Sequence, residues 1–330
     1  MMRSLLLLAL MLLSCRPADA ADACAHRGEL DAAYCDEDRD LTADPPADPA
    51  RRRRPASLLL SYSPQEDTAT YEKLWQPYVA HMGRCTAMPV RFFQVHSSAA
   101  AVEAFRSGRL QFSMLATGDT PFAVNVAGAV PYAGIGRNGS GGVRLLSYHV
   151  VVLVKNDSPF HKLADLRGRR VAHTAPSSNS GNMAPRALFP AEGLVPDRDY
   201  RVIYSGKHDN SITGVLRGDY DAAAVADDVL DRMLARGLVR PGQFRIIYTS
   251  KPFPSGSMVM AHDLDSSLAA TIRDCTLSYR FSPELVRAFQ GADRYVPLNY
   301  RRDFDAVREV ARRSGEPINR ANSSKSKESN

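Results

Sequence analysis

The chain has 330 residues, 44% of them hydrophobic, which is enough for roughly two compact units and excludes a largely disordered polypeptide. The formal net charge of +6 is modest, and the four arginines at 51–54 contribute much of it. Basic residues are not interleaved with aromatic residues, as a nucleic-acid footprint requires, so we expect no nucleic-acid partner.

The first 20 residues have the pattern of a secretory signal, with Arg3 before an apolar run that is too short to span a membrane. Two processing sites compete. The residues from Leu12 to Cys15 look like a bacterial lipobox, in which Cys15 would be lipidated, whereas residues 18–20 (Ala-Asp-Ala) fit ordinary cleavage. We predict an exported, periplasmic protein. Of the two processing sites we slightly favour lipidation of Cys15, which would be the only membrane contact of the protein, over cleavage and release without a lipid.

Four cysteines remain after Cys15, namely Cys24, Cys35, Cys85 and Cys275. An even number in an exported protein favours disulfide bonds. Cys24 with Cys35 closes a short loop at little entropic cost, which would leave Cys85 with Cys275 as a long-range pair, although the sequence does not fix this connectivity. No cysteine or histidine cluster has zinc spacing, so we expect no metal and no cofactor.

Residues 21–56 are rich in Asp, Ala and Pro. Four of the aspartates alternate as in a calcium-binding loop: Asp36, Asp38, Asp40 and Asp44. However, Leu41 stands where an EF-hand needs Gly, and Ala47 stands where it needs a bidentate Glu. We therefore predict a flexible, solvated linker.

The globular part begins at residue 57 with alternating strands and helices. Strands are expected at 58–60, 90–93 and 112–116, and helices at 66–82, 97–108 and from 119 onward. This rhythm indicates a mostly parallel sheet flanked by helices, with ligands beyond the carboxyl ends of the strands. A nearly unbroken apolar run at 144–155 is long enough to cross into a second lobe.

The second lobe repeats the pattern. Strands at 170–172, 202–204 and 222–225 each lead into a polar helix start, and a return strand follows at 244–250. A rigid turn and a strand at 258–260 lead back, and amphipathic helices occupy 266–289 and 303–311. We predict an α/β clamshell with two hinge crossovers, in which 57–150 and 252–312 form lobe 1, 151–251 form lobe 2 and 313–330 are a disordered tail.

One helix start is unusually polar. Ser178, Asn179 and Ser180 lie between a strand and a helix and can cap the helix or donate hydrogen bonds. Gly181 would let a ligand approach the backbone. The unpaired N–H groups and the positive dipole end of such a helix suit a tetrahedral oxyanion, although an ordinary capped loop has the same pattern. The segment lacks the Lys of a P-loop, so it does not indicate a nucleotide site.

Several segments together resemble a known family. They are Ser-Asn-Ser-Gly at 178–181, Ser-Gly-x-His-Asp at 205–209, Gly-Asp-Tyr-Asp-Ala at 218–222, the segment 163–172 and Tyr-Val-Pro-Leu-Asn-Tyr at 295–300. Over residues 57–310 the chain is similar to the periplasmic substrate-binding proteins of ABC importers for phosphonate, phosphite and phosphate. The resemblance implies a monomeric type II binding protein with two lobes.

The resemblance also implies a ligand set. Ser178, Asn179, Ser180 and Gly181 would hold the anion, His208 would donate from its imidazole, and Tyr148 would close over the ligand from the hinge. Ser97 and Thr117 would be the donors of lobe 1. Asp228 would accept a hydrogen bond from a P–OH group or from the amine of an aminoalkyl tail. Alternatively, it is only a charge that the helix dipole favours at a helix start. Residues 255–257 lack the carboxylate of members that bind aminoalkylphosphonates, and Ser97 stands where those members can carry an aromatic. We therefore favour phosphate, phosphite or methylphosphonate.

These observations predict a solute-binding component that delivers a small phosphorus oxyanion to an ABC permease. One alternative is a sensor that docks on a membrane kinase. Another is a hydrolase that uses Ser178 or Ser180 with His208 and Asp228, but the chain lacks the Gly-x-Ser-x-Gly turn of such enzymes. We expect no enzymatic activity.

Overall fold

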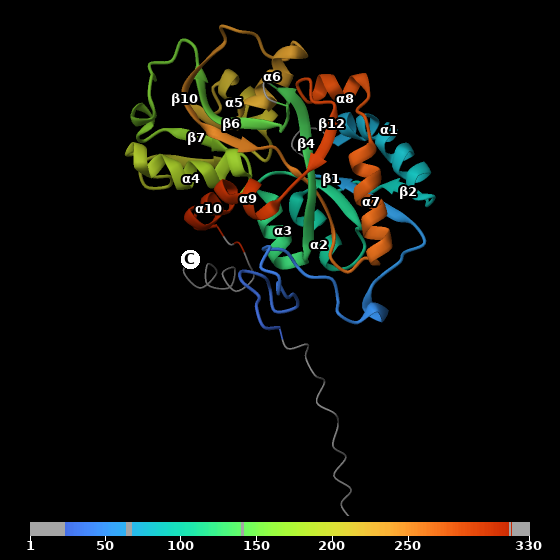
Figure 1. Ribbon diagram of the computed structural model, residues 1–330. Coiled ribbons are helices and arrows are strands. Elements are labelled where there is room, and N and C mark those ends of the chain that lie inside the picture. Colours follow the sequence, from blue (N-terminus) through green and yellow to red (C-terminus); the bar gives the residue numbers. More distant parts are fainter. Residues whose placement is uncertain (1–23, 64–67, 140–141, 317, 319–330) are drawn as a thin grey trace, which may run out of the picture.

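The computed structural model describes residues 24–63, 68–139, 142–316 and 318. The predicted signal sequence with Cys15, and residues 317 and 319–330 of the predicted tail, lie outside the described residues. The expectation of a disordered tail is wrong for residues 313–316, because Arg313 ends the last helix and Glu316 forms an ion pair with Arg186. Two separate sheets, each flanked by helices, form two lobes (Figure 1). Within the described part of the chain, no helix is long and apolar enough to cross a membrane.

The first lobe contains a seven-stranded sheet with the order β12-β4-β11-β3-β1-β2, and β5 pairs with β4. Its strands are β1 (Leu58–Tyr62), β2 (Val90–Phe92), β3 (Phe112–Leu115), β4 (Ala129–Gly139), β5 (Gly142–Leu145), β11 (Ser257–Ala261) and β12 (Arg294–Pro297). Only β1, β2 and β3 pair in parallel, and the other pairs are antiparallel. The sheet is therefore mixed, whereas the sequence predicted a mostly parallel one.

The second lobe contains a five-stranded sheet with the order β10-β6-β9-β7-β8. Its strands are β6 (Ser147–Lys155), β7 (Arg170–His173), β8 (Arg201–Tyr204), β9 (Ala222–Ala226) and β10 (Phe244–Pro254). Every residue of β9 is buried, because β9 lies inside the sheet and both of its faces are covered, as its unbroken run of small apolar residues indicates.

Helices cover both sheets. In lobe 1 they are α1 (Thr68–Thr86), α2 (Ser98–Arg106), α3 (Asp119–Ala127), α7 (Ser266–Ser278) and α8 (Pro283–Ala288). In lobe 2 they are α4 (Ala184–Leu188), α5 (His208–Arg217) and α6 (Asp227–Ala235). Trp75 of α1 is 1% exposed and packs in the core of lobe 1, as predicted. The disulfide between Cys85 and Cys275 joins α1 to α7.

The chain crosses between the lobes at two predicted hinges. Residue 146 separates β5 from β6, and residues 255–256 separate β10 from β11. Both hinge strands, β6 and β10, pair wholly within the second sheet. The second lobe therefore extends a few residues beyond each end of the predicted range 151–251.

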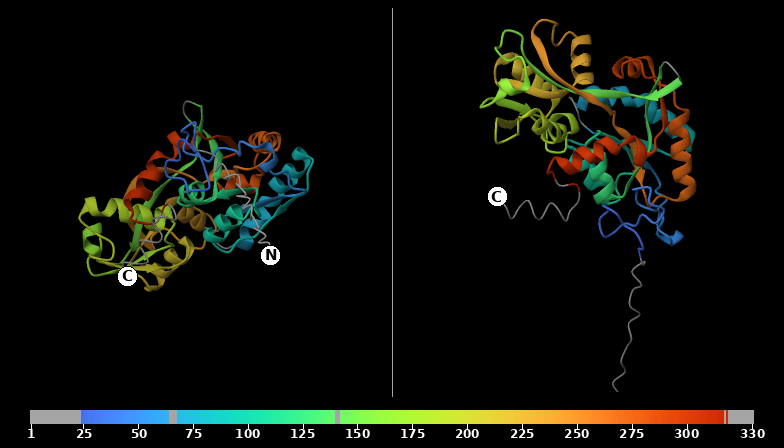
Figure 2. Two further views of the ribbon diagram at one scale, coloured as in Figure 1. Left: turned by 90° about the horizontal axis from the view of Figure 1, so that it is seen from below. Right: turned by 60° about the vertical axis from the view of Figure 1, so that its left-hand side comes forward.

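A third crossing was not predicted. After β12, the helices α9 (Tyr300–Asp303) and α10 (Asp305–Arg313) leave the first sheet. Phe304 and Val307 join the same buried cluster as Val151 and Val225 of the second sheet. Figure 2 shows these C-terminal helices between the lobes, and α10 packs mainly on α4. The assignment of residues up to 312 to lobe 1 is therefore wrong for α10.

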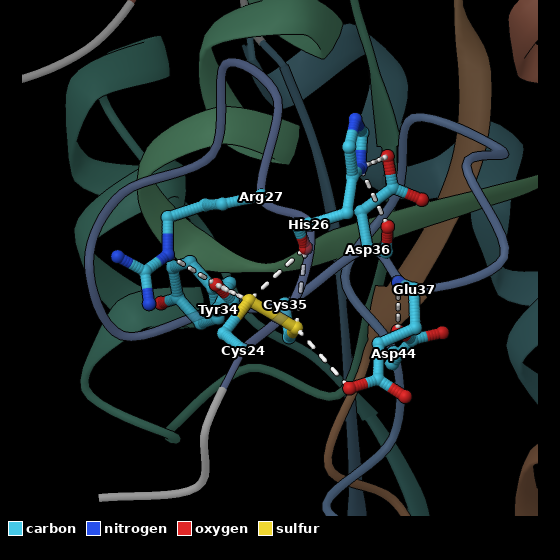
Figure 3. The surroundings of a disulfide bond; sticks show 8 residues. All are labelled: Cys24, His26, Arg27, Tyr34, Cys35, Asp36, Glu37 and Asp44. Carbon is cyan, nitrogen blue, oxygen red and sulfur yellow. Dashed lines mark hydrogen bonds and ion pairs between the residues drawn. A yellow bond between two sulfur atoms is a disulfide. The ribbon is translucent and has the colours of Figure 1, made fainter.

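The N-terminal segment is not a flexible linker over its described residues 24–56. Cys24 and Cys35 form the predicted disulfide (Figure 3). Leu30, between them in the chain, is buried. The guanidinium of Arg53 makes a two-pronged ion pair with the carboxylate of Asp263. Arg53 thus ties the segment to lobe 1, whereas Leu30 joins the same buried cluster as Phe304 and Val307, so the segment packs on both lobe 1 and the C-terminal helices. Figure 2 shows the segment on the lower side of the molecule, below these helices.

The alternating aspartates are explained by a turn in this segment. The carboxylate oxygens of Asp36, Asp38 and Asp40 lie within 4.8 Å of one another. Asp36 is 1% exposed and accepts a hydrogen bond from the backbone N–H of Leu41, and Asp40 accepts one from Thr42. Burial raises the pKa of Asp36 above its ordinary value.

Candidate functional site

A cavity of about 80 Å³ lies between the two lobes. Its walls come from the carboxyl ends of strands and from the helix starts that follow them, which is where open α/β sheets bind ligands. Lobe 1 contributes the start of α3 and lobe 2 contributes the starts of α5 and α6. Seven of the nine predicted ligand residues line it, namely Ser178, Asn179, Ser180, His208, Tyr148, Thr117 and Asp228.

The polar helix start of lobe 2 forms one wall. The hydroxyl of Ser178 accepts a hydrogen bond of 3.1 Å from the backbone N–H of Gly181 and so caps the turn. Residues Asn179–Met183 form a π-helical turn that continues into α4. Such turns are rare and are often found at functional sites.

Gly181 has a different role from the predicted one. It is buried, and it is not among the cavity-lining residues. A Cβ atom at this position would overlap the side chain of Thr174. The glycine therefore lets the helix start pack on Thr174, and it does not open the backbone to a ligand.

Tyr148 and Asn179 form a buried pair in the cavity wall. The side-chain amide of Asn179 donates a hydrogen bond of 2.7 Å to the hydroxyl of Tyr148. Burial raises the pKa of Tyr148 above its ordinary value, so its hydroxyl keeps its proton and can donate it in a hydrogen bond. Asn179 Oδ1 has no hydrogen-bond partner among the described residues.

His208 is the first residue of α5 and is 7% exposed. Its Nε2 atom lies 3.4 Å from the hydroxyl oxygen of Ser180. Asp228, which the hydrolase alternative needed to orient this histidine, instead forms an ion pair of 2.9 Å with Arg232 one turn further along α6. Arg232 also lines the cavity, so a buried guanidinium lies beside the predicted acceptor.

The sequence prediction for lobe 1 was wrong by one residue. Ser97 is exposed, and its hydroxyl caps α2 by accepting from the N–H of Ala100. Ser98 lines the cavity and donates a hydrogen bond of 2.5 Å to Asp119. Thr117 lines the cavity as predicted, but its hydroxyl already donates to the carbonyl of Pro254 at 3.0 Å.

Asp119 is a cavity residue that sequence reasoning missed. It begins α3 and is 3% exposed, and the hydroxyls of Ser98 and Ser177 hydrogen-bond to its carboxylate. Burial raises its pKa above the ordinary value, and these hydrogen bonds oppose the rise. The cleft therefore holds a second carboxyl group, although residues 255–257 offer none. The position of Asp119 at a predicted helix start was the feature of the sequence that could have identified it.

The two lobes touch at this point. A Cβ atom on Gly118 of lobe 1 would overlap the carbonyl oxygen of Ser177 and the amide nitrogen of Asn179 in lobe 2. The hydrogen bond between Asp119 and Ser177 crosses at the same place. The start of α3 therefore rests directly on the polar helix start, and the lobes are closed.

Two hinged α/β lobes that close on a small cavity lined by helix starts define a periplasmic-type solute-binding protein. The family model described as "ABC transporter, phosphonate, periplasmic substrate-binding protein" matches residues 60–303. The chain belongs to this family. Its members are components of transporters, which gives no support to the hydrolase or the kinase-sensor alternative.

Two curated relatives agree. The chain is 26% identical over 234 residues to the phosphate-import protein PhnD of Mycolicibacterium smegmatis, covering 67% of this chain and 71% of the relative. It is 22% identical over 215 residues to the phosphonates-binding periplasmic protein of Escherichia coli, covering 64% and 62%.

A solved structure supports the fold. PhnD1 from Prochlorococcus marinus, solved with methylphosphonate, matches with a TM-score of 0.69 at 16% identity, covering 80% of this chain and all of that one.

Proposed function

We propose that this protein captures a small phosphorus oxyanion, namely phosphate, phosphite or a small alkylphosphonate, and delivers it to an ABC permease in the inner membrane. The observation that carries the proposal is the small cavity of about 80 Å³ between the lobes, at the polar helix start that leads into α4. This volume is well below the range of about 300 to 1,000 Å³ of sites for drug-sized ligands, so it suits a compact head group.

The chemistry of the cavity wall supports an anionic ligand. The helix starts at Asn179, His208 and Asp227 surround the cavity, and the first-turn N–H groups of each start lie at a positive dipole end. Arg232 and Lys207 add positive charge to the lining. Ser180, His208 and Tyr148 line the cavity, and a hydroxyl or imidazole N–H of each would donate to the anion.

The two carboxyl groups would select for protonated oxyanions. A carboxylate can only accept hydrogen bonds, so Asp119 and Asp228 favour a ligand with a P–OH group. Sulfate carries no proton at neutral pH and would leave a buried acceptor facing a bare anion, which is costly. We therefore expect this site to reject sulfate.

Closure would couple binding to transport. The ligand would bind first to the helix starts of lobe 2, and lobe 1 would then close with Gly118 against Ser177. A ligand that contacts both lobes stabilises the closed form over the open one. The permease would recognise that closed form, and a lipid on Cys15 would keep the monomeric protein near the membrane.

The test is calorimetric titration of the mature protein after bound anion has been stripped. The ligands are phosphate, phosphite, methylphosphonate, 2-aminoethylphosphonate and sulfate. We expect tight binding of one of the first three and no heat with sulfate. Binding of none of the phosphorus compounds would refute the proposal.

A paired variant tests the anion-binding wall. We expect Ser180→Ala to lose about 10-fold to 150-fold in affinity, because a hydrogen bond to a charged group contributes about 1.5–3 kcal/mol. The matched control is Ser107→Ala, since Ser107 is exposed and caps α2 outside the cavity. Unchanged binding in Ser180→Ala would remove this helix start from the site.

A further inference from the structure

The segment after α10 contacts elements from both sides of the ligand cavity. α10 ends at Arg313, and Gly315 follows with a φ of +76°, a left-handed conformation that glycine adopts without strain. α10 packs on α4 of lobe 2 and also lies against α3 of lobe 1 (Figure 1). We call the described residues 314–316 and 318 the C-terminal clasp.

On the lobe 2 side, the C-terminal clasp contacts Asn182. The carboxylate of Glu316 accepts a hydrogen bond of 2.7 Å from the side-chain amide of Asn182 and lies 3.3 Å from the guanidinium of Arg186. Asn182 is fully buried and belongs to the π-helical turn that contains Asn179 and Ser180. A buried amide N–H without an acceptor is costly, so Glu316 completes the surroundings of this side chain.

The same asparagine holds the loop that precedes the turn. The second N–H of the Asn182 amide donates a hydrogen bond of 2.9 Å to the carbonyl of Pro176, and its Oδ1 atom accepts one of 2.8 Å from Nδ1 of His173. Asn182 thus ties β7 to the loop that contains Ser177. This is the loop against which Gly118 of lobe 1 rests, so Asn182 supports both the anion-binding turn and the contact between the lobes.

On the lobe 1 side, the C-terminal clasp contacts the end of α3. The side-chain amide of Asn125 donates a hydrogen bond of 3.0 Å to the backbone carbonyl of Ile318, and Asn125 is 4% exposed. From Asp119 to Asn125 the helix rises about 9 Å, at about 1.5 Å per residue. α3 therefore meets lobe 2 directly at its start, where Asp119 bonds to Ser177, and meets the C-terminal clasp near its end.

From these contacts we infer that Glu316 is a positioning residue of the ligand site and acts through Asn182. Glu316 holds the turn with Asn179 and Ser180 in the shape that receives the anion. Ile318 fastens the same segment to α3, so the C-terminal clasp also favours the closed arrangement of the lobes. Its effect on affinity rests on the proposed function, since the anion is placed at that turn.

The C-terminal clasp is a feature of this chain outside the region that defines its family. The match to the family model ends at residue 303, before α10 begins at Asp305. A segment that preorganises one wall and favours closure raises the affinity for any ligand that contacts both lobes. The C-terminal clasp thus adjusts how tightly the protein holds its ligand without touching the ligand.

Calorimetric titration of the mature protein with phosphate, phosphite and methylphosphonate tests this role. We expect Glu316→Ala to weaken the tightest of these about fivefold, because Asn182 loses an acceptor. Glu316→Gln keeps an amide oxygen there and should bind within about twofold of the unaltered protein. The control is Glu309→Ala, which makes the same charge change as Glu316→Ala at an exposed position of α10 and should bind unchanged.

A truncation tests both contacts of the C-terminal clasp together. A chain that ends at Gly315 lacks Glu316 and Ile318, and we expect it to bind about tenfold more weakly, a larger loss than in Glu316→Ala. A chain that ends at residue 320 keeps both contacts and is the matched control, which should bind like the full chain. Equal affinity of the two truncated chains would contradict the inference.

Hydrogen–deuterium exchange without ligand measures the positioning separately from affinity. The backbone N–H of Asn182 donates to the carbonyl of Ser178 at 3.0 Å, so its exchange reports the order of the turn. We expect exchange across residues 178–183 to be about tenfold faster in Glu316→Ala than in the unaltered protein. Glu316→Gln and Glu309→Ala should exchange like the unaltered protein.

The outcomes separate the two proposals. If the unaltered protein binds none of the phosphorus compounds, the proposed function fails, and the exchange rates still decide whether Glu316 positions the turn. Equal affinity and equal exchange in Glu316→Ala and Glu309→Ala would overturn the inference. A loss in Glu316→Ala that Glu316→Gln does not restore would assign the effect to charge alone and would also overturn it.

Discussion

The two faces of the cleft use their polar side chains differently. On the lobe 1 face, the hydroxyl of Thr117 donates to the carbonyl of Pro254, and Ser98 donates to Asp119. On the lobe 2 face, Asn179 Oδ1 has no partner among the described residues, and His208 lies 3.4 Å from Ser180. Lobe 1 therefore acts mainly as a cover, while lobe 2 keeps hydrogen-bonding capacity for a ligand.

The lobes also differ in how they are held together. The disulfide between Cys85 and Cys275 closes a sequence separation of 190 residues and fastens α1 to α7 in lobe 1. Among the described residues, lobe 2 contains no disulfide and is held by packing around β9 and by α10. Lobe 1, which covers the ligand, is thus also the lobe that a disulfide cross-links.

The largest expected effect tests this difference. We expect Cys85→Ser with Cys275→Ser to lower the free energy of unfolding by about 4 kcal/mol, because the broken link closes a long loop. Ligand affinity at 25 °C should stay within about threefold, since neither cysteine lines the cavity. Denaturant titration with calorimetry measures both, and a loss of affinity without a loss of stability would contradict the division of roles.

His173 provides a pH test of the support behind the lobe 2 face. It is fully buried between Asn182 and Tyr200, and burial lowers its pKa from 6.5 to about 4. Between pH 6.5 and pH 4 the unfolded chain therefore binds more protons than the folded one, so stability falls as the pH falls. A shift of this size corresponds to up to about 3 kcal/mol.

We expect His173→Gln to be less sensitive to acid than the unaltered protein. The measurement is the free energy of unfolding at pH 7 and pH 4 for both proteins. The size of the decrease between the two pH values is the readout, so a general destabilisation of the variant does not affect the conclusion. An equal decrease in both would show that His173 does not cause the acid sensitivity.

The contact at Gly118 tests the covering role of lobe 1. Alanine at this position would overlap Ser177 only when the lobes are closed, so affinity should fall by about tenfold to hundredfold while the open form stays stable. Gly83→Ala in α1 is the control, because its Cβ meets nothing closer than 3.6 Å. Solution scattering with ligand should show that Gly118→Ala stays open, and a closed, tight-binding variant would refute this role.

The smallest effects compare one hydroxyl from each side. Tyr148→Phe should weaken binding of the favoured anion by about tenfold, because it removes a donor that faces the cavity. Thr117→Ala should change affinity by less than about threefold, because that hydroxyl is already bonded to Pro254. A larger loss in Thr117→Ala than in Tyr148→Phe would reverse the comparison between the faces.

Much of the site was predictable because its parts are local. A strand followed by small polar residues and a helix places Ser180, His208 and Asp228 at helix starts, and the carboxyl ends of neighbouring strands meet at one edge. Asp119 and Ser98 were missed for a physical reason. Their presence in the cavity depends on how closely the lobes approach, which no local pattern encodes.

The sequence by itself determined the alternation of strands and helices, the two strand crossovers and the polar helix starts, because periodicity and capping act over a few residues. Only the tertiary structure decided the strand directions in the mixed sheets, the packing of α10 on lobe 2 and the ordering of residues 24–56. It also placed Arg232 in the wall of the cavity, beside Asp228. These features depend on contacts between residues far apart in the chain, and those contacts exist only after the lobes have packed together.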